Sequence, residues 1–187
     1  MRKTVLSLAV IALVMLSMFN LHAASLAGVT LPDTVRIGST TLVLNGLGLR
    51  TKFAVKVYVA GLYVMHKSSD GNAIVKEDAP KQMVLHFVRG VSQAQMTDAF
   101  DRAIDDNTPD ARKTMKSDID RFLAALEPVK EGDQMVFTYV PGTGTTLTIN
   151  QREKFTISGS SFSQVLFSIW LGPKPPNEGL QKGILGK

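Results

Sequence analysis

The chain has 187 residues, a formal net charge of only +5 and no cysteine. Such a small excess of positive charge, without a dense basic cluster, argues against nucleic-acid binding. The lack of cysteine excludes disulfides, thiol catalysis and cysteine-ligated metal sites.

The N-terminus has the pattern of a secretory signal peptide. Arg2-Lys3 precedes an uncharged, mostly apolar run over residues 4–19, and small residues follow it. The run is shorter than the ~20 residues of a spanning helix, and no later run is long and apolar enough. We therefore predict a signal peptide over residues 1–23, cleavage after Ala23 or Ala24, and an exported, periplasmic protein without a transmembrane segment. An uncleaved membrane anchor is the alternative interpretation.

The first strands are predicted over residues 35–37 and 41–44, around a short turn. A glycine-rich stretch then leads to Arg50, and a run of β-branched and aromatic residues without proline follows it. This run predicts a strand from Phe53 to Val64. Both of its faces are largely apolar, so we expect the strand to be covered on both sides.

Another strand, apolar on both faces, is predicted over residues 83–88. Ser92 and Gln95 form the capping box of a helix. Thr108-Pro109 begins a second helix, which ends at Pro128. Met96, Phe100 and Phe122 belong to the apolar stripes of these two helices, which therefore form a pair that lies on a sheet.

The remaining elements form a meander and a last helix. Strands are predicted over residues 134–140, 145–149 and 154–157, and a helix from the N-cap Ser161 to Gly172-Pro173. Trp170 lies on the apolar side of this helix and is expected to pack against the sheet. The proline- and glycine-rich tail is expected to wrap the surface. Strands, then helices, then strands and a helix indicate an α+β fold with an antiparallel sheet, which we place in a single domain over residues 24–187.

Two motifs resemble the chalcone isomerase-like family, above all its bacterial exported branch and its fatty-acid-binding members. They are Gly-x-Gly-x-Arg, which ends at Arg50, and Lys-x-Tyr-x-x-Gly-x-Tyr over residues 56–63. The run 162–172 is also similar, and the resemblance covers residues 31–186. Its most specific parts are Arg50 and residues 168–172. The resemblance implies an open-faced β-sandwich, in which a layer of α-helices covers a large antiparallel sheet.

Arg50 is the sharpest site candidate, because a guanidinium at the mouth of an apolar pocket can hold a carboxylate through paired donors. A structural salt bridge is the alternative. Tyr58 is the second candidate, and core packing is its alternative. The resemblance implies that these two residues bind a ligand carboxylate, as in the fatty-acid-binding members. Lys56 and Tyr63 are weaker candidates for the lining of the site, with a solvent-facing lysine and a core tyrosine as the alternatives.

The spacing of Arg50 and Tyr58 poses a geometric problem. They have the same parity, but eight residues of straight strand span about 26 Å. They can meet one carboxylate only if the chain turns or bulges between them, near Thr51-Lys52 or at Gly46 and Gly48.

Two function classes follow, and a third is open. The first is an exported binding protein for a fatty acid or a similar amphiphilic carboxylate. The alternative is an intramolecular lyase of the chalcone isomerase type, but Tyr58 stands where the plant enzymes have threonine, and the helix after Ser92 lacks their tyrosine and asparagine. The third is an interaction or assembly protein. No cofactor or metal is expected, because His66 and His86 have no second ligand at useful spacing, and the oligomeric state is open.

Overall fold

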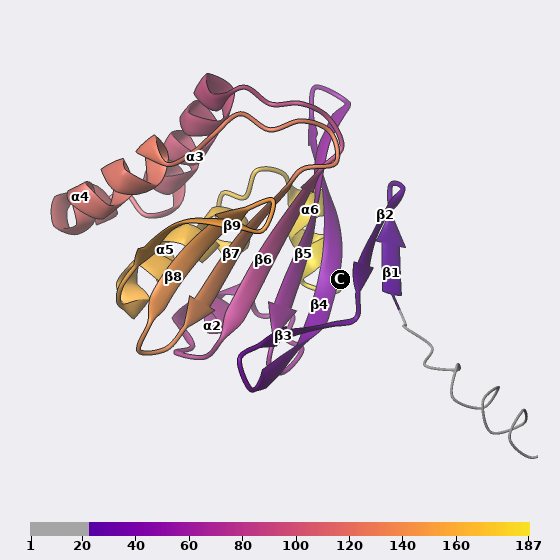
Figure 1. Ribbon diagram of the computed structural model, residues 1–187, viewed down its shortest axis with the longest axis horizontal. Coiled ribbons are helices and arrows are strands. Elements are labelled where there is room, and N and C mark those ends of the chain that lie inside the picture. The colour runs from indigo at the N-terminus through magenta and orange to yellow at the C-terminus, as the bar shows by residue number, and fades with distance from the viewer. Residues whose placement is uncertain (1–22) are drawn as a thin grey trace, which may run out of the picture.

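A seven-stranded antiparallel sheet forms the centre of the computed structural model, which describes residues 23–187 (Figure 1). The predicted signal peptide lies outside these residues, apart from Ala23. Each strand of the sheet pairs with the next one along the chain, so the predicted antiparallel sheet is confirmed. The strands are β3 (Thr34–Ile37), β4 (Thr40–Lys52), β5 (Val55–Val64), β6 (Lys81–Phe87), β7 (Gln134–Val140), β8 (Gly144–Ile149) and β9 (Arg152–Ile157).

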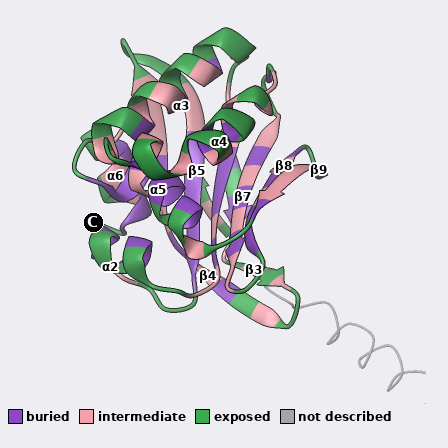
Figure 2. Cartoon of the chain, turned by 90° about the vertical axis from the view of Figure 1, so that its left-hand side faces the viewer, coloured by how far each residue is buried: buried purple, intermediate pink, exposed green. Residues whose placement is uncertain are grey.

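Helices cover one face of this sheet, which confirms the α+β class and the open-faced β-sandwich (Figure 2). They are α2 (Gly71–Lys76), α3 (Gln93–Asn107), α4 (Ala111–Ala124), α5 (Ser160–Leu171) and α6 (Glu178–Ile184). The predicted capping box of α3 is present, with both Ser92–Gln95 bonds. The predicted cap of α5 is wrong, because that helix begins at Ser160 after Gly159, which has no side chain to cap it. Within residues 23–187, none of the helices is long and apolar enough to cross a membrane.

The opposite face of the sheet is covered only in part, by the hairpin of β1 (Ala23–Leu26) and β2 (Val29–Pro32). Alternation along β5 places Tyr58, Ala60 and Leu62 against the helices, while Val59 and Tyr63 face this hairpin. The expectation of a strand covered on both sides is therefore correct from Val59 to Val64, all of which are buried.

Aromatic side chains fill the space between the sheet and the helices. Phe100 of α3, Phe122 of α4 and Trp170 of α5 surround Phe137 of β7, with ring centroids 5.8, 6.1 and 5.6 Å from it. All four are buried. The predicted packing of the two helical stripes and of Trp170 on the sheet is confirmed.

The C-terminal tail does not simply wrap the surface. Residues 178–184 form α6, whose Leu180 and Ile184 are fully buried. The helix backbone lies directly on β4, where a Cβ on Gly48 would collide with the carbonyl oxygen of Leu180, and one on Gly46 with that of Gly183. Both glycines of the sequence motif are thus explained by this close approach, which no side chain would permit.

Candidate functional site

A tight turn brings Arg50 and Tyr58 together. The predicted strand from Phe53 was wrong at its start, because Phe53 and Ala54 form a two-residue turn that connects β4 to β5. Arg50 is therefore directly opposite Tyr58 in the register, and residues opposite each other point to the same face. The straight-strand separation of about 26 Å does not arise.

Tyr58 lies against the aromatic core. Its hydroxyl oxygen accepts a hydrogen bond of 3.0 Å from Nε1 of Trp170, and its ring meets that of Phe87 edge-on at 5.6 Å. Burial raises the pKa of Tyr58 to about 12, although the Trp170 bond and the charge of Arg50 act in the opposite direction. Because the indole can only donate, the hydroxyl hydrogen of a neutral Tyr58 remains available for an acceptor.

Arg50 has no acidic partner in the described part of the chain. Its guanidinium donates to the backbone carbonyl of Thr51, and it forms no ion pair within residues 23–187. The structural salt bridge, which was the alternative reading of this arginine, is therefore not formed there. The half-buried guanidinium keeps donors that a ligand anion can accept from.

The other two candidates are placed differently. Lys56 is exposed, two residues before Tyr58 and towards the turn. Tyr63 is fully buried on the opposite face, where its hydroxyl donates to the carbonyl of Pro32 at 2.8 Å. The structure does not bring Tyr63 to Arg50; the tyrosine connects β5 to β2, and burial raises its pKa to about 12, with a further contribution from Asp33.

Trp170 belongs to the site, although sequence reasoning treated it only as a packing residue. It contacts Tyr58 from 112 positions away in the chain. No spacing rule connects residues so far apart. The similarity of residues 168–172 to the family was the only feature that pointed to this region.

Two pockets in the described part of the chain lie away from Arg50. One pocket of about 600 Å³ lies between the β1–β2 hairpin and β4, and one of about 530 Å³ lies between α2, the start of α4 and α5. Neither is lined by Arg50 or Tyr58. Beside Tyr58 the space under the helices is occupied by Phe87, Phe100 and Trp170. Among the described residues there is also no group of three metal-ligating side chains.

Comparison with known proteins gives a family and a fold. A family model described as chalcone isomerase-like matches residues 23–186, and no curated protein matches the chain. The crystal structure of a fatty-acid binding protein of Arabidopsis thaliana is similar with a TM-score of 0.66 and 14% identity, over 88% of this chain and 96% of that one. At this identity the likeness shows the fold. The match of the family model over nearly all of the described residues shows that the chain belongs to the chalcone isomerase-like family.

Proposed function

We propose that the protein is an exported, periplasmic binding protein for a fatty acid or a similar amphiphilic carboxylate, whose head group is bound by Arg50 and Tyr58. The observation that carries this proposal is the pairing of the two residues across the β4–β5 turn, with no acidic side chain on Arg50 within residues 23–187. A charged donor and a neutral donor on one face suit one carboxylate.

The raised pKa of Tyr58 favours binding over base catalysis. With a pKa of about 12, the phenol is protonated at neutral pH and donates a hydrogen bond, but it does not remove a proton from a substrate. A lyase of the chalcone isomerase type would have to use the same two donors to stabilise an enolate. Turnover of a chalcone by the purified protein would support that alternative.

The acyl tail has to enter the helix-covered side of the sheet. Its burial would contribute about 0.8 kcal/mol per methylene, but the rings of Phe87, Phe100 and Trp170 now occupy this space. Binding therefore requires these rings to move apart. Trp170 is the chain's sole tryptophan and is bonded to Tyr58, so its fluorescence would report the movement.

The test is a titration with dodecanoate and with dodecanol, followed by Trp170 fluorescence and by calorimetry. Arg50→Ala should cost about 2–4 kcal/mol of affinity for the acid and much less for the alcohol, which has no carboxylate. Tyr58→Phe should cost about 1 kcal/mol. Arg36→Ala is the matched control, since Arg36 is exposed on β3 and only donates to its neighbour Gly38. If Arg50→Ala weakens acid and alcohol equally, or neither, the arginine is structural.

Export is tested separately. The mature protein should begin at Ala24 or Ser25 and be recovered from the periplasm, because of the N-terminal pattern. An intact mass of all 187 residues in a soluble fraction would contradict this part of the proposal. Native mass spectrometry of protein purified from its host would show whether a lipid is retained.

A further inference from the structure

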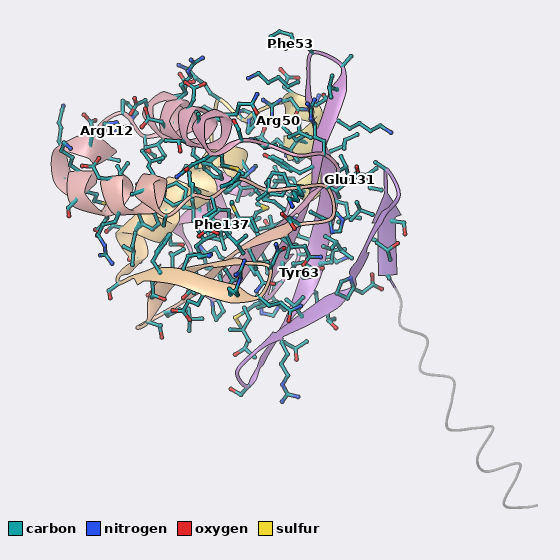
Figure 3. All side chains as sticks on the ribbon, turned by 45° about the horizontal axis from the view of Figure 1, so that its top comes forward. Arg50, Phe53, Tyr63, Arg112, Glu131 and Phe137 are labelled. Carbon is teal, nitrogen blue, oxygen red and sulfur yellow. The ribbon has the colours of Figure 1, made fainter. Side chains whose placement is uncertain are left out.

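The tip of the β4–β5 hairpin presents a large apolar side chain to water. Phe53 is 92% exposed, and Val55, the first residue of β5 after the turn, is 44% exposed. The hairpin projects from the protein body, and Figure 3 shows Phe53 at its outermost point with Arg50 farther in. An aromatic ring in this position contributes no packing to the fold.

The turn itself is made of residues that do not favour it. Phe53 and Ala54 have φ angles of 50° and 63°, the left-handed pair of a type I′ turn, for which Asn-Gly is preferred. The other two-residue hairpin turns of residues 23–187 follow the preference, because each contains asparagine or glycine; they are Ala27-Gly28, Gly38-Ser39 and Asn150-Gln151. Turn formation therefore does not account for phenylalanine at this tip.

Positive charge surrounds the ring. Lys52 and Lys56 flank the turn and are exposed, and Arg50 lies on the same hairpin. None of the three forms an ion pair within the described residues, and no acidic residue stands between positions 49 and 59. An exposed aromatic ring between unpaired lysines matches the interface of an anionic bilayer, where the ring enters the boundary of the acyl chains and the lysines meet the phosphates.

We propose that residues 52–56 form a membrane-docking tip that inserts Phe53 into the interface of an anionic lipid bilayer. This inference rests on the proposed function, since docking of the tip would bring the Arg50–Tyr58 site to a source of acyl chains. Arg50 lies three strand residues from Phe53, or about 10 Å along the hairpin, so the guanidinium would remain near the head groups. One ring and two lysines give weak, reversible docking, which lets a carrier leave the surface.

The test is cosedimentation of the mature protein with vesicles of phosphatidylcholine containing about 30% phosphatidylglycerol, with pure phosphatidylcholine as comparison. The double variant F53N/A54G should bind the anionic vesicles about tenfold more weakly or worse, because the ring is lost. Its Asn-Gly turn suits the type I′ geometry, so the hairpin should be preserved. K52Q/K56Q should lose about fivefold per lysine and most of the salt dependence.

Matched controls lie at the other end of β5. Met65 is 40% exposed there, and Lys67 is exposed close by. Met65→Asn and Lys67→Gln should leave vesicle binding unchanged. Absence of wild-type binding, equal binding by F53N/A54G, or equal loss in the controls would overturn the docking tip, as would an association of Phe53 with protein partners alone.

The two proposals can fail separately. F53N/A54G should keep the wild-type affinity for dodecanoate in solution, because neither residue belongs to the Arg50–Tyr58 site. If Arg50→Ala leaves dodecanoate binding intact while vesicle binding still depends on Phe53, the proposed ligand site is wrong and the docking tip is supported. If F53N/A54G loses dodecanoate and vesicles together, the tip is part of the ligand site and separate docking is overturned.

Discussion

The two ends of the β4–β5 hairpin differ in how their side chains are packed: the inner end is buried, and the outer end is exposed to water. At the inner end, Gly46 and Gly48 carry no side chain, so that α6 can lie on the strand, and Tyr63 and Val64 are buried. At the outer end, Phe53 and its flanking lysines extend into water. Packing explains the residues at the inner end. At the outer end, the exposed ring of Phe53 contributes nothing to the packing of the fold. Variants at the two ends should therefore change the free energy of unfolding by different amounts and in opposite directions.

The largest expected effect is at the inner end. Gly48→Ala would place a Cβ against the backbone of α6, which cannot yield as a flexible side chain can. We expect a loss of about 3 kcal/mol or more in the free energy of unfolding, measured by urea denaturation. Gly179→Ala in the same helix is the control, since its Cβ would meet only the Asn177 side chain, at 3.8 Å. Equal stability of the two variants would show that α6 does not need the glycine.

A buried lysine at the same inner end provides the second prediction. Lys81 begins β6, and its ammonium donates to the carbonyls of Ile74 and Glu77 at 2.6 and 2.7 Å. Burial lowers the pKa of Lys81 from 10.5 to about 8, against the opposing charges of Glu77 and Asp78. Between these two pH values the unfolded chain binds more protons than the folded protein, so the free energy of unfolding rises with pH.

Lys81 should contribute about 2 kcal/mol to this rise between pH 8 and pH 10, which is the expected difference between the wild-type profile and that of Lys81→Met. The wild-type profile itself should level off above about pH 9.5. There Tyr58, Tyr63 and Tyr139, whose pKa values are each raised to about 12, act in the opposite direction, because their unfolded forms lose protons first. A flat wild-type profile would contradict the effect of burial on Lys81.

A smaller effect on stability is expected at Tyr58, which lies between the two ends of the hairpin. Tyr58→Phe leaves the buried indole N–H of Trp170 without its acceptor and should cost about 1–2 kcal/mol of unfolding free energy. It should also shift the emission of Trp170. Tyr63→Phe likewise loses one hydrogen bond, but on the opposite face, and should leave that emission unchanged. A shift of the same size in both variants would show that the emission does not report on the Tyr58 contact.

The smallest effect should have the opposite sign. F53N/A54G replaces two strained turn residues with the preferred pair and should raise the free energy of unfolding by about 0.5–1 kcal/mol. Thermal denaturation would detect this gain. A loss of stability would mean that Phe53 supports the fold, and the contrast between the two ends would fail.

Local features were sufficient to predict most of the elements. The Ser92–Gln95 capping box, the strand over residues 134–140 and the α+β class follow from side chains only a few positions apart. Alternation along β5 places Tyr58 and Tyr63 on opposite faces of the sheet, although the family motif contains both tyrosines. The resemblance selected Arg50 and Tyr58, and their role stays a prediction.

Tertiary structure decided what local pattern could not. The Phe53-Ala54 turn lacks the asparagine or glycine that is typical of such turns. Its position is therefore known only from the pairing of β4 with β5. The short helix α6 becomes stable because it packs on the glycines of a strand more than a hundred residues earlier, which its own sequence does not reveal. The bond from Trp170 to Tyr58 has the same origin. Sequence by itself determines the contacts within one turn or strand, and the burial of apolar surface between distant segments determines which of those segments meet.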